Sequence, residues 1–350
     1  MSTASDQPSN DRYARQRQYP PIGQAGQAAI QRSDVAIVGC GALGTVAAEI
    51  LARAGVGRLR LIDRDVVEWT NLQRQSLFDE ADARAGVAKA AAAADRLSQI
   101  NRQISIQPLV HDLDVDNIRD LLRDVDLVID AADNFAVRLL LNDWSLATKT
   151  PWVHGGCVGA EGQVRLFPAN QSFCFRCLVP QLPPPGTVAT CDTAGVLGSA
   201  THTIASLQAT EALKWLSGNR QAVCRDVTSI DLWNNRIRQV SISDAIRKTC
   251  PACRGDYGFL DGRESTGRGQ AESLCGRNAI QISGDAGTRL DLTAAAQRWE
   301  SLGQVTTTPF FARLHLSDKQ TLTLFRDGRA VISGTDDTTV ARSLYDRYVG

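Results

Sequence analysis

The clearest hydrophobic pattern in the chain is a short apolar run that ends in glycines. Residues 34–38 read DVAIV and lead directly into Gly39-Cys40-Gly41-Ala42-Leu43-Gly44. An apolar run followed at once by glycines is typical of a buried strand that turns into a helix. Residues 45–54 favour this helix, Gly55 ends it, and residues 58–62 predict a second strand. We therefore expect a βαβ unit here.

Strands and helices continue to alternate after this unit. We expect helices at 89–100, 115–122 and 195–216, and strands at 104–110, 126–131, 227–231 and 236–241. Short strands after residue 152 are expected to extend the same sheet. The alternation predicts an α/β fold with a Rossmann-like, doubly wound mixed sheet.

Four segments divide the chain. Residues 1–33 predict a polar N-terminal arm with one short helix, and the arm has no apolar run to anchor it on its own core. The segments that follow are an α/β domain at 34–254, a polar and glycine-rich linker at 255–273, and a small α+β domain at 274–350. Within the last segment, LTLFRDGRAVIS predicts a hairpin around Asp327-Gly328, and a helix at 337–348 is expected to cover it.

Charge is balanced along the chain. Lys plus Arg and Asp plus Glu each number 38 among 350 residues, so the formal net charge is zero. No global field then attracts nucleic acid or an anionic membrane. No apolar run approaches the length of a membrane span, and the N-terminus lacks the apolar segment of a signal peptide. We expect a cytoplasmic protein without nucleic acid or membrane as partner.

Nine cysteines in a chain of this size indicate metal ligands or catalytic thiols. Two C-x-x-C pairs, Cys174/Cys177 and Cys250/Cys253, offer four thiolates, the ligand set of a closed, structural zinc site. A redox site is the alternative. It is disfavoured because both pairs are expected in irregular segments, whereas a redox C-x-x-C begins a helix, and because one redox site needs only one pair.

The glycine turn allows backbone N–H groups and a helix N-terminus to face a phosphate. Asp63 follows the second strand at the spacing of an acid that binds ribose hydroxyls, which favours a nucleotide. The alternative is a turn whose glycines only let a helix pack closely on a strand. Arg74 and Lys89 suit a triphosphate better than a dehydrogenase cofactor, and Asp133 is placed to hold Mg²⁺.

Several motifs together resemble one known family. They are RYARQ at 12–16, GCGALG at 39–44, DRDVVEWTNLQRQ at 63–75, Lys89, DAADNFAVR at 130–138, CFRC at 174–177, Thr190-Cys191 and CPAC at 250–253. Over about residues 11–254 the chain resembles the ubiquitin-activating-enzyme-like (HesA/MoeB/ThiF) adenylyltransferases, of the bacterial MoeB/ThiF type. Departures are small. Ala42 stands where many members have glycine, and the segment between Gln75 and Lys89 is slightly long.

The resemblance implies that residues 34–254 form an ATP-binding adenylyltransferase domain. It implies that Asp63 binds ribose, that Asp133 is the magnesium ligand, and that Arg15 reaches the γ-phosphate from the other subunit of a homodimer. The phosphates are expected on Asn71, Arg74 and Lys89. The full set of expected nucleotide contacts is Gly39, Gly41, Ala42, Gly44, Asp63, Asp65, Asn71, Arg74, Gln75, Lys89, Asp133 and Asn134.

Cys191 follows a Pro-rich loop, in the Thr-Cys context of this family's crossover-loop cysteine. In some members that thiol takes the activated acyl group, and in others adenylation suffices. A small residue packed under a loop is the alternative. We expect Cys40 and Cys157 in the core, and the sequence assigns no role to Cys224 or Cys275. The four histidines are expected to be structural.

The sequence therefore predicts an enzyme that activates the Gly-Gly C-terminus of a small ubiquitin-like sulfur-carrier protein with ATP, for thiocarboxylate formation. A sulfur donor protein is a further expected partner. The alternatives are a non-catalytic scaffold subunit, and a relative that adenylates a peptide or a tRNA base. The segment 274–350 lacks the persulfide loop of a rhodanese domain, and for it carrier docking and passive stabilisation stay open.

Overall fold

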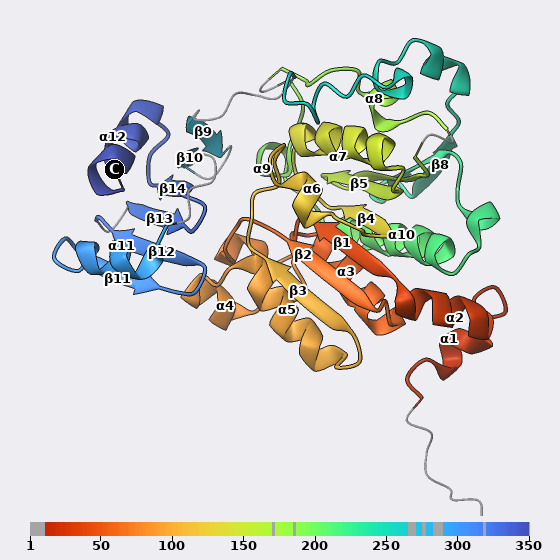
Figure 1. The fold of residues 1–350 in the computed structure, drawn as a ribbon, viewed down its shortest axis with the longest axis horizontal. Coiled ribbons are helices and arrows are strands. Elements are labelled where there is room, and N and C mark those ends of the chain that lie inside the picture. Colours follow the sequence, from red (N-terminus) through yellow and green to blue (C-terminus); the bar gives the residue numbers. More distant parts are fainter. Residues whose placement is uncertain are drawn as a thin grey trace, which may run out of the picture.

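The computed structural model describes residues 11–169, 172–184, 187–264, 271–274, 278–282, 290–317 and 320–349. Two sheets organise them (Figure 1). The first has eight strands in the order β3-β2-β1-β4-β5-β6-β7-β8, and the second has six in the order β11-β12-β13-β14-β10-β9. Strands β2 and β3 lie on one side of β1, and strands β4 to β8 lie on the other side. The predicted doubly wound mixed sheet is therefore confirmed.

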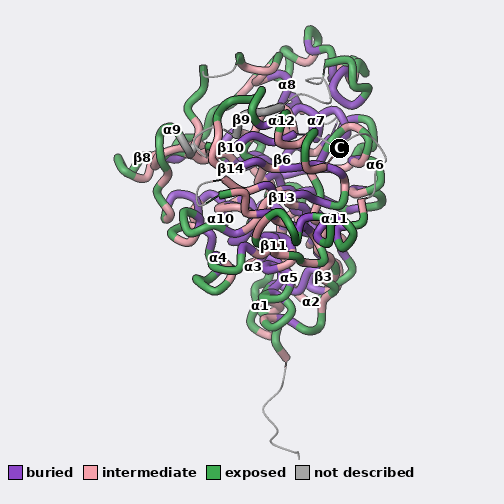
Figure 2. Tube along the Cα trace, turned by 90° about the vertical axis from the view of Figure 1, so that its left-hand side faces the viewer, coloured by how far each residue is buried: buried purple, intermediate pink, exposed green. Residues whose placement is uncertain are grey.

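The first five strands run parallel and lie where the sequence predicted strands. They are β1 (Asp34–Val38), β2 (Arg58–Ile62), β3 (Ser105–Leu109), β4 (Leu127–Asp130) and β5 (Trp152–Val158). Three antiparallel strands extend the sheet, as expected: β6 (Glu161–Phe167), β7 (Val227–Asp231) and β8 (Arg236–Val240). Strand β8 is exposed along its whole length at the edge (Figure 2).

Helices cover both faces of this sheet and create two apolar cores. One core includes α3 (Gly44–Ala54), α5 (Lys89–Ile100) and α10 (Gly198–Leu216), and the other includes α6 (Ile118–Leu121) and α7 (Phe135–Thr148). The helix expected at 115–122 is only the four residues of α6. Neither α4 (Glu80–Ala85) nor α7 was predicted from the sequence.

The N-terminal arm contains α1 (Ala14–Gln18) and α2 (Gly23–Arg32), and it is anchored on its own domain. Tyr13 is 5% exposed, and its hydroxyl accepts a hydrogen bond from Asn101 Nδ2 at 2.9 Å. Ile30 is fully buried in the main core. The prediction that the arm has no anchor on its own core was wrong. Two isolated side chains, Tyr13 and Ile30, anchor the arm although it has no apolar run.

The second sheet is antiparallel. Its strands are β9 (Ala271–Leu274), β10 (Ala279–Ile282), β11 (Gln304–Thr307), β12 (Phe311–His315), β13 (Thr321–Phe325) and β14 (Ala330–Ser333). The predicted hairpin is confirmed, with Leu324 opposite Ala330. Helix α11 (Leu292–Trp299) packs on β11 and β12, and the predicted terminal helix is α12 (Thr338–Tyr348).

Part of the predicted linker belongs to the packed structure. Phe259 and Leu260 are buried, and the Phe259 N–H donates to Asp143 Oδ2 at 3.0 Å. Glu264 forms an ion pair with Arg176. Residues 265–270 lie outside the described residues. Among the residues that the structure describes, no helix has the length and apolar composition that a membrane crossing requires.

Candidate functional site

The carboxyl ends of β1, β2 and β4 meet at one edge of the first sheet. Val38, Ile62 and Asp130 are register partners there. The Gly39 N–H donates to the Ile62 carbonyl at 2.8 Å, and the Cys40 N–H donates to Asp63 Oδ2 at 2.6 Å. Open α/β sheets bind ligands at the carboxyl ends of their strands, at the point where the connections after two neighbouring strands lead to opposite sides of the sheet.

The glycines of the first turn have different reasons for being glycine. Gly39 has a φ of +95°, and a Cβ there would lie 2.5 Å from the Ala131 carbonyl oxygen. A Cβ on Gly44, the first residue of α3, would lie 1.8 Å from the Gly39 oxygen. Gly41 faces more open space, with Gln75 Nε2 as the nearest neighbour at 3.9 Å. Ala42 beside it is half-buried. The turn is therefore closed at its ends and accessible in its middle.

Two acids and a lysine lie beside this turn. Asp63 Oδ1 accepts a hydrogen bond from the Asp65 N–H at 2.7 Å, and Lys89 Nζ lies 3.1 Å from Asp65 Oδ2. Burial raises the pKa of Asp63, and the nearby Lys89 ammonium opposes this shift. Lys89 is only 4% exposed, at the start of α5. The buried Lys89 ammonium is a positive charge on a flexible side chain, which can rotate toward a bound anion.

The segment after β2 presents further polar groups. Asn71 ends the short helix η1 (Trp69–Asn71), where its Oδ1 accepts from the Glu68 N–H at 3.0 Å. Its Nδ2 is then the group that could donate to a phosphate. Arg74 is half-buried and donates to the Thr70 carbonyl at 2.7 Å. Gln75 is buried, and its Oε1 has no hydrogen-bond partner among the described residues.

These groups fit a nucleotide chemically. Lys89 and Arg74 could supply positive charge for a polyphosphate, and Asp63 could offer carboxylate oxygens to ribose hydroxyls. The unpartnered Gln75 oxygen is a buried acceptor, which a polar ligand would satisfy at a gain of about 1–3 kcal/mol.

The loop after β4 carries the predicted magnesium ligand. Strand β4 ends at Asp130, and the exposed Asp133 follows three residues later. Asn134 is the N-cap of α7: its Oδ1 accepts from the Val137 N–H at 2.9 Å. Its Nδ2 lies 3.3 Å from Asp133 Oδ1. The Asp133 carboxylate therefore projects from a short loop, and carboxylate oxygens are the ligands that Mg²⁺ prefers.

A buried polar group supports this loop, and sequence reasoning missed it. Asp130 is fully buried, with Oδ2 at 2.7 Å from His154 Nδ1 and 3.3 Å from Arg138 Nε. The Ala132 N–H donates to Asp130 Oδ1 at 3.0 Å, and Arg138 donates to the Ala132 carbonyl at 2.7 Å. Burial lowers the pKa of His154. The one sequence signal was a histidine inside the otherwise apolar strand β5.

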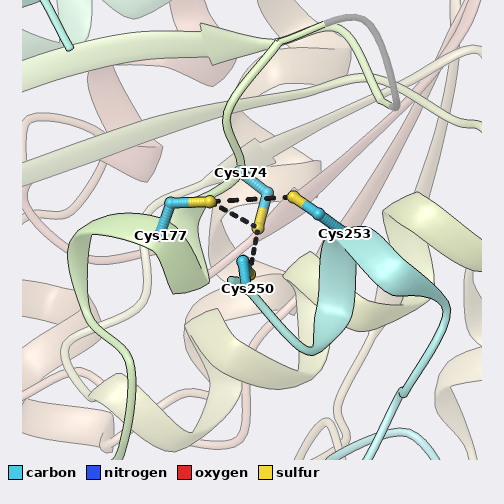
Figure 3. A group of neighbouring side chains, drawn as sticks. All are labelled: Cys174, Cys177, Cys250 and Cys253. Atoms are coloured by element: carbon cyan, nitrogen blue, oxygen red, sulfur yellow. Dashed lines mark hydrogen bonds between the residues drawn. The ribbon is translucent and has the colours of Figure 1, made fainter. Parts of the chain in front are cut away.

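The four cysteines of the C-x-x-C pairs come together (Figure 3). Their sulfurs all lie within 4.8 Å of one another, and the closest pairs are 3.6, 3.7 and 3.8 Å apart. A tetrahedral zinc with Zn–S bonds of about 2.3 Å has S–S edges of about 3.8 Å. Hydrogen bonding within the cluster lowers the pKa of Cys250 and Cys253 and raises the pKa of Cys174. The cluster could therefore hold zinc.

One reason given against a redox pair was wrong. Cys174 is the N-cap residue of the short helix α8 (Phe175–Leu178), and Cys253 lies in the 3-10 helix η4 (Ala252–Arg254), so the pairs are not in irregular segments. The distance between the pairs decides the matter instead. Because the cluster joins all four sulfurs, the arrangement matches a tetrathiolate rather than one redox pair.

Arg15 lies far from the other predicted nucleotide contacts of its own chain. It is exposed on α1 and donates to Gln18 Oε1 at 3.1 Å. The adjacent Tyr13 ring packs on Gly55, where a Cβ would lie 2.5 Å from it. Gly55 ends α3, about 16 Å of helix away from the glycine turn at its start. The structure thus places Arg15 at the opposite edge of the sheet.

The remaining cysteines are dispersed. Cys191 begins the one-turn helix α9 (Cys191–Ala194), and the Thr190 side chain caps this helix by accepting a hydrogen bond from the Thr193 N–H at 3.2 Å. The side chain of Cys191 lies outside the described part of the structure. Cys40 is buried, as expected, and Cys157 and Cys224 are half-buried. Cys275 lies outside the described residues.

Most of the chain resembles known proteins. A family model described as the ThiF family matches residues 13–252. The chain is 41% identical over 342 residues to the "Sulfur carrier protein ThiS adenylyltransferase" of Bacillus subtilis, covering 97% of this chain and 99% of that protein. It is 37% identical over 248 residues to the "Sulfur carrier protein adenylyltransferase" of Thermus thermophilus, covering 69% of this chain and 90% of the relative.

A solved structure shares the fold. The crystal structure of E. coli MccB with ATP superposes with a TM-score of 0.60 at 22% identity, covering 70% of this chain and 75% of that chain.

Proposed function

Because the chain belongs to the ThiF family, we propose that it uses ATP to adenylate the C-terminal glycine of a small ubiquitin-like sulfur-carrier protein. One observation carries this proposal: a relative named as the adenylyltransferase of such a carrier matches 97% of this chain at 41% identity. The chain is accordingly a nucleotidyltransferase. Its product is an acyl-adenylate prepared for thiocarboxylate formation, which brings in a sulfur donor protein as a later partner.

We propose the following roles for the residues at the sheet edge. Asp63 holds the ribose, while Lys89 and Arg74 neutralise the triphosphate. The terminal carboxylate of the carrier attacks the α-phosphorus, a new acyl P–O bond forms, and the bond to the departing pyrophosphate breaks. No general base is needed, because the attacking carboxylate is already ionised. Asp133 would hold Mg²⁺, which supplies further positive charge to the leaving group.

The position of Arg15 supports a shared active site. Since Arg15 lies at the opposite edge of the sheet from Lys89, it does not serve the site of its own chain. We propose that α1 delivers Arg15 to the γ-phosphate of a second copy in a homodimer. A guanidinium can grip a phosphate through two parallel hydrogen bonds. Because Tyr13 anchors α1 on its own domain, the position of Arg15 is already fixed before the dimer forms.

Zinc has a structural role in this proposal. A tetrathiolate leaves no open position for substrate or water. The four cysteines tie α8 to η4, which lie far apart in the sequence. We place the enzyme in the cytoplasm, where thiols stay reduced.

Three alternatives have less support: a scaffold subunit, adenylation of a tRNA base and adenylation of a peptide. A scaffold subunit would not need Arg15, Arg74, Lys89 and Asp133 together, and all four are present. A tRNA substrate would favour a basic surface, whereas the net charge is zero. Peptide adenylation has no support beyond the fold, because the E. coli MccB structures with MccA are only 21–22% identical to this chain.

ATP–pyrophosphate exchange tests the proposal. We expect exchange that depends on a purified carrier with a free Gly-Gly terminus and is absent for the same carrier without its last glycine. NADH oxidation by the protein is the control for dehydrogenase chemistry and should not occur. Exchange driven equally by an unrelated short peptide would assign the chain to peptide adenylation instead.

A further inference from the structure

The second sheet touches the nucleotide edge of the first. In Figure 1 the second sheet lies to the left of the first, with β12 next to α4, and the contacts identify which side chains join the two sheets. Two of these side chains are arginines: Arg329, in the turn before β14, and Arg313, in the middle of β12. Each reaches a segment of the first sheet that carries residues of the nucleotide site.

Arg329 binds the turn between the two acids. Its Nη2 donates to the Arg64 carbonyl at 2.8 Å, and Arg64 is the residue between Asp63 and Asp65. Arg329 is only 3% exposed, and burial lowers its pKa. A buried guanidinium that donates a hydrogen bond to a backbone carbonyl restricts the conformation of that backbone segment.

The hairpin holds Arg329 ready for this contact. Its guanidinium lies 3.7 Å from the centre of the Phe325 ring, and its N–H donates to Asp327 Oδ1 at 3.1 Å. Tyr345 from α12 donates to the Gly328 carbonyl at 2.9 Å. The Phe325 ring therefore supports the Arg329 guanidinium, and two hydrogen bonds support the backbone of the turn.

A second path joins the same two places. Arg329 Nη1 donates to Gln281 Oε1 at 3.4 Å, and Gln281 Nε2 donates to Asp112 Oδ2 at 3.1 Å. Asp112 in turn pairs with Arg64 Nη1 at 2.8 Å. Arg64 is therefore held through its carbonyl by Arg329 directly and through its side chain by the Gln281–Asp112 bridge.

Arg313 contacts the segment that leads to Lys89. A Cβ on Gly86, which ends α4 with a φ of +58°, would lie 2.6 Å from Arg313 Nη1. Arg313 Nε donates to Thr323 Oγ1 at 3.0 Å, which fixes it on the sheet. Just after Gly86, the Val67 N–H donates to the Val87 carbonyl and the Lys89 N–H donates to the Asp65 carbonyl, at 2.8 and 2.9 Å.

From these contacts we propose that the second sheet positions the ATP-binding loops: Arg329 fixes the turn of Asp63 and Asp65, and Arg313 fixes the turn that leads to Lys89. Both are positioning residues, since they act through the loops. This inference rests on the proposed function of the site. It gives the C-terminal segment a role in nucleotide affinity, distinct from both carrier docking and passive stabilisation.

Arg329→Gln in the full-length protein tests the proposal, with Arg326→Gln as the matched control. Arg326 belongs to the same hairpin turn but is exposed, so the control removes the same charge without touching the loops. Calorimetry without carrier should show a Kd for ATP raised about fivefold or more in Arg329→Gln, as expected for the loss of a charged hydrogen bond, and unchanged in Arg326→Gln. In the full reaction, KM for ATP should rise, while kcat and the KM for the carrier change little.

Hydrogen exchange gives a readout that needs neither ATP nor carrier. In Arg329→Gln the amides of Asp65, Val67 and Lys89 should exchange faster, while those of β4 keep wild-type rates. If Arg329→Gln does not fold, as judged by zinc content and melting temperature, Gln281→Ala and Arg313→Gln replace it with the same expectations. A wild-type Kd for ATP in a folded variant overturns the proposal. Wild-type protein that binds ATP yet shows no carrier-dependent exchange refutes only the proposed function.

Discussion

The zinc-type cysteine cluster and the nucleotide edge are both built from residues distant in sequence, but they differ in what holds them together. In the cluster, four sulfurs converge within 4.8 Å and leave no open position. At the edge, Asp63, Lys89 and Asp133 come from three different segments, and Asp133 remains exposed. A closed set of ligands can only stabilise, whereas an open set of charges can meet a substrate. Loss of the first should affect folding, and loss of the second should affect chemistry.

Removal of one thiol should have the largest effect. We expect Cys250→Ser to lose zinc and to lower the melting temperature by about 10 °C or more, because metal binding contributes directly to folding. Cys224→Ser, at a half-buried cysteine outside the cluster, is the control and should keep both. Metal analysis and calorimetry measure this. A Cys250→Ser protein with wild-type stability and reduced exchange would reverse the comparison.

Removal of one charge at the edge should stop the chemistry and spare the fold. We expect Asp133→Ala to lower ATP–pyrophosphate exchange by about 100-fold or more, because the variant would no longer hold the Mg²⁺ that balances the charge on the triphosphate. Zinc content and melting temperature should stay at wild-type values. Asp95→Ala, at an exposed acid on α5, is the control. Near-normal exchange in Asp133→Ala would remove this residue from the site.

A mixture of variants sharpens the comparison by asking whether the edge is complete in one chain. Arg15→Ala and Lys89→Ala should each be inactive alone. Coexpressed, they should form heterodimers in which one of the two sites has both residues intact, so that part of the activity returns. Two results would contradict a shared site. One is wild-type ATP–pyrophosphate exchange by Arg15→Ala alone, and the other is a mixture that stays inactive although its subunits demonstrably form heterodimers.

Cys191 should have the smallest effect on adenylation. If it relays the acyl group, Cys191→Ala should keep wild-type exchange, form no thiol-sensitive conjugate with the carrier, and fail to yield thiocarboxylate. Mass spectrometry of the carrier measures this, with Cys224→Ala as the control. Full thiocarboxylate production by Cys191→Ala would leave this residue only a structural role.

The same comparison explains what the sequence could predict. Strands β1, β2 and β4 were predicted from the sequence, and parallel strands bring their carboxyl ends together, so the glycine turn and Asp63 could be placed in advance. The cysteine pairs have a spacing that already implies their chemistry. In both cases a local pattern carries the information.

Other features depend on packing that no local pattern reveals. Tyr13 anchors the arm through a single ring, and the Asp130–His154 pair forms only because β4 and β5 are neighbours. The contact of Arg329 with Arg64 spans 265 residues of sequence. Each needs the relative position of elements that periodicity and spacing do not determine.

The mass of the carrier itself tests the central claim most directly. A Gly-Gly carrier incubated with the protein, ATP and Mg²⁺ should gain the mass of one adenylyl group at its C-terminal glycine, and a carrier with an amidated terminus should gain nothing. The gain should disappear with Lys89→Ala and persist with Asp95→Ala. An unmodified carrier in the presence of folded, ATP-bound protein, or a gain that does not require the free carboxylate, would contradict the account.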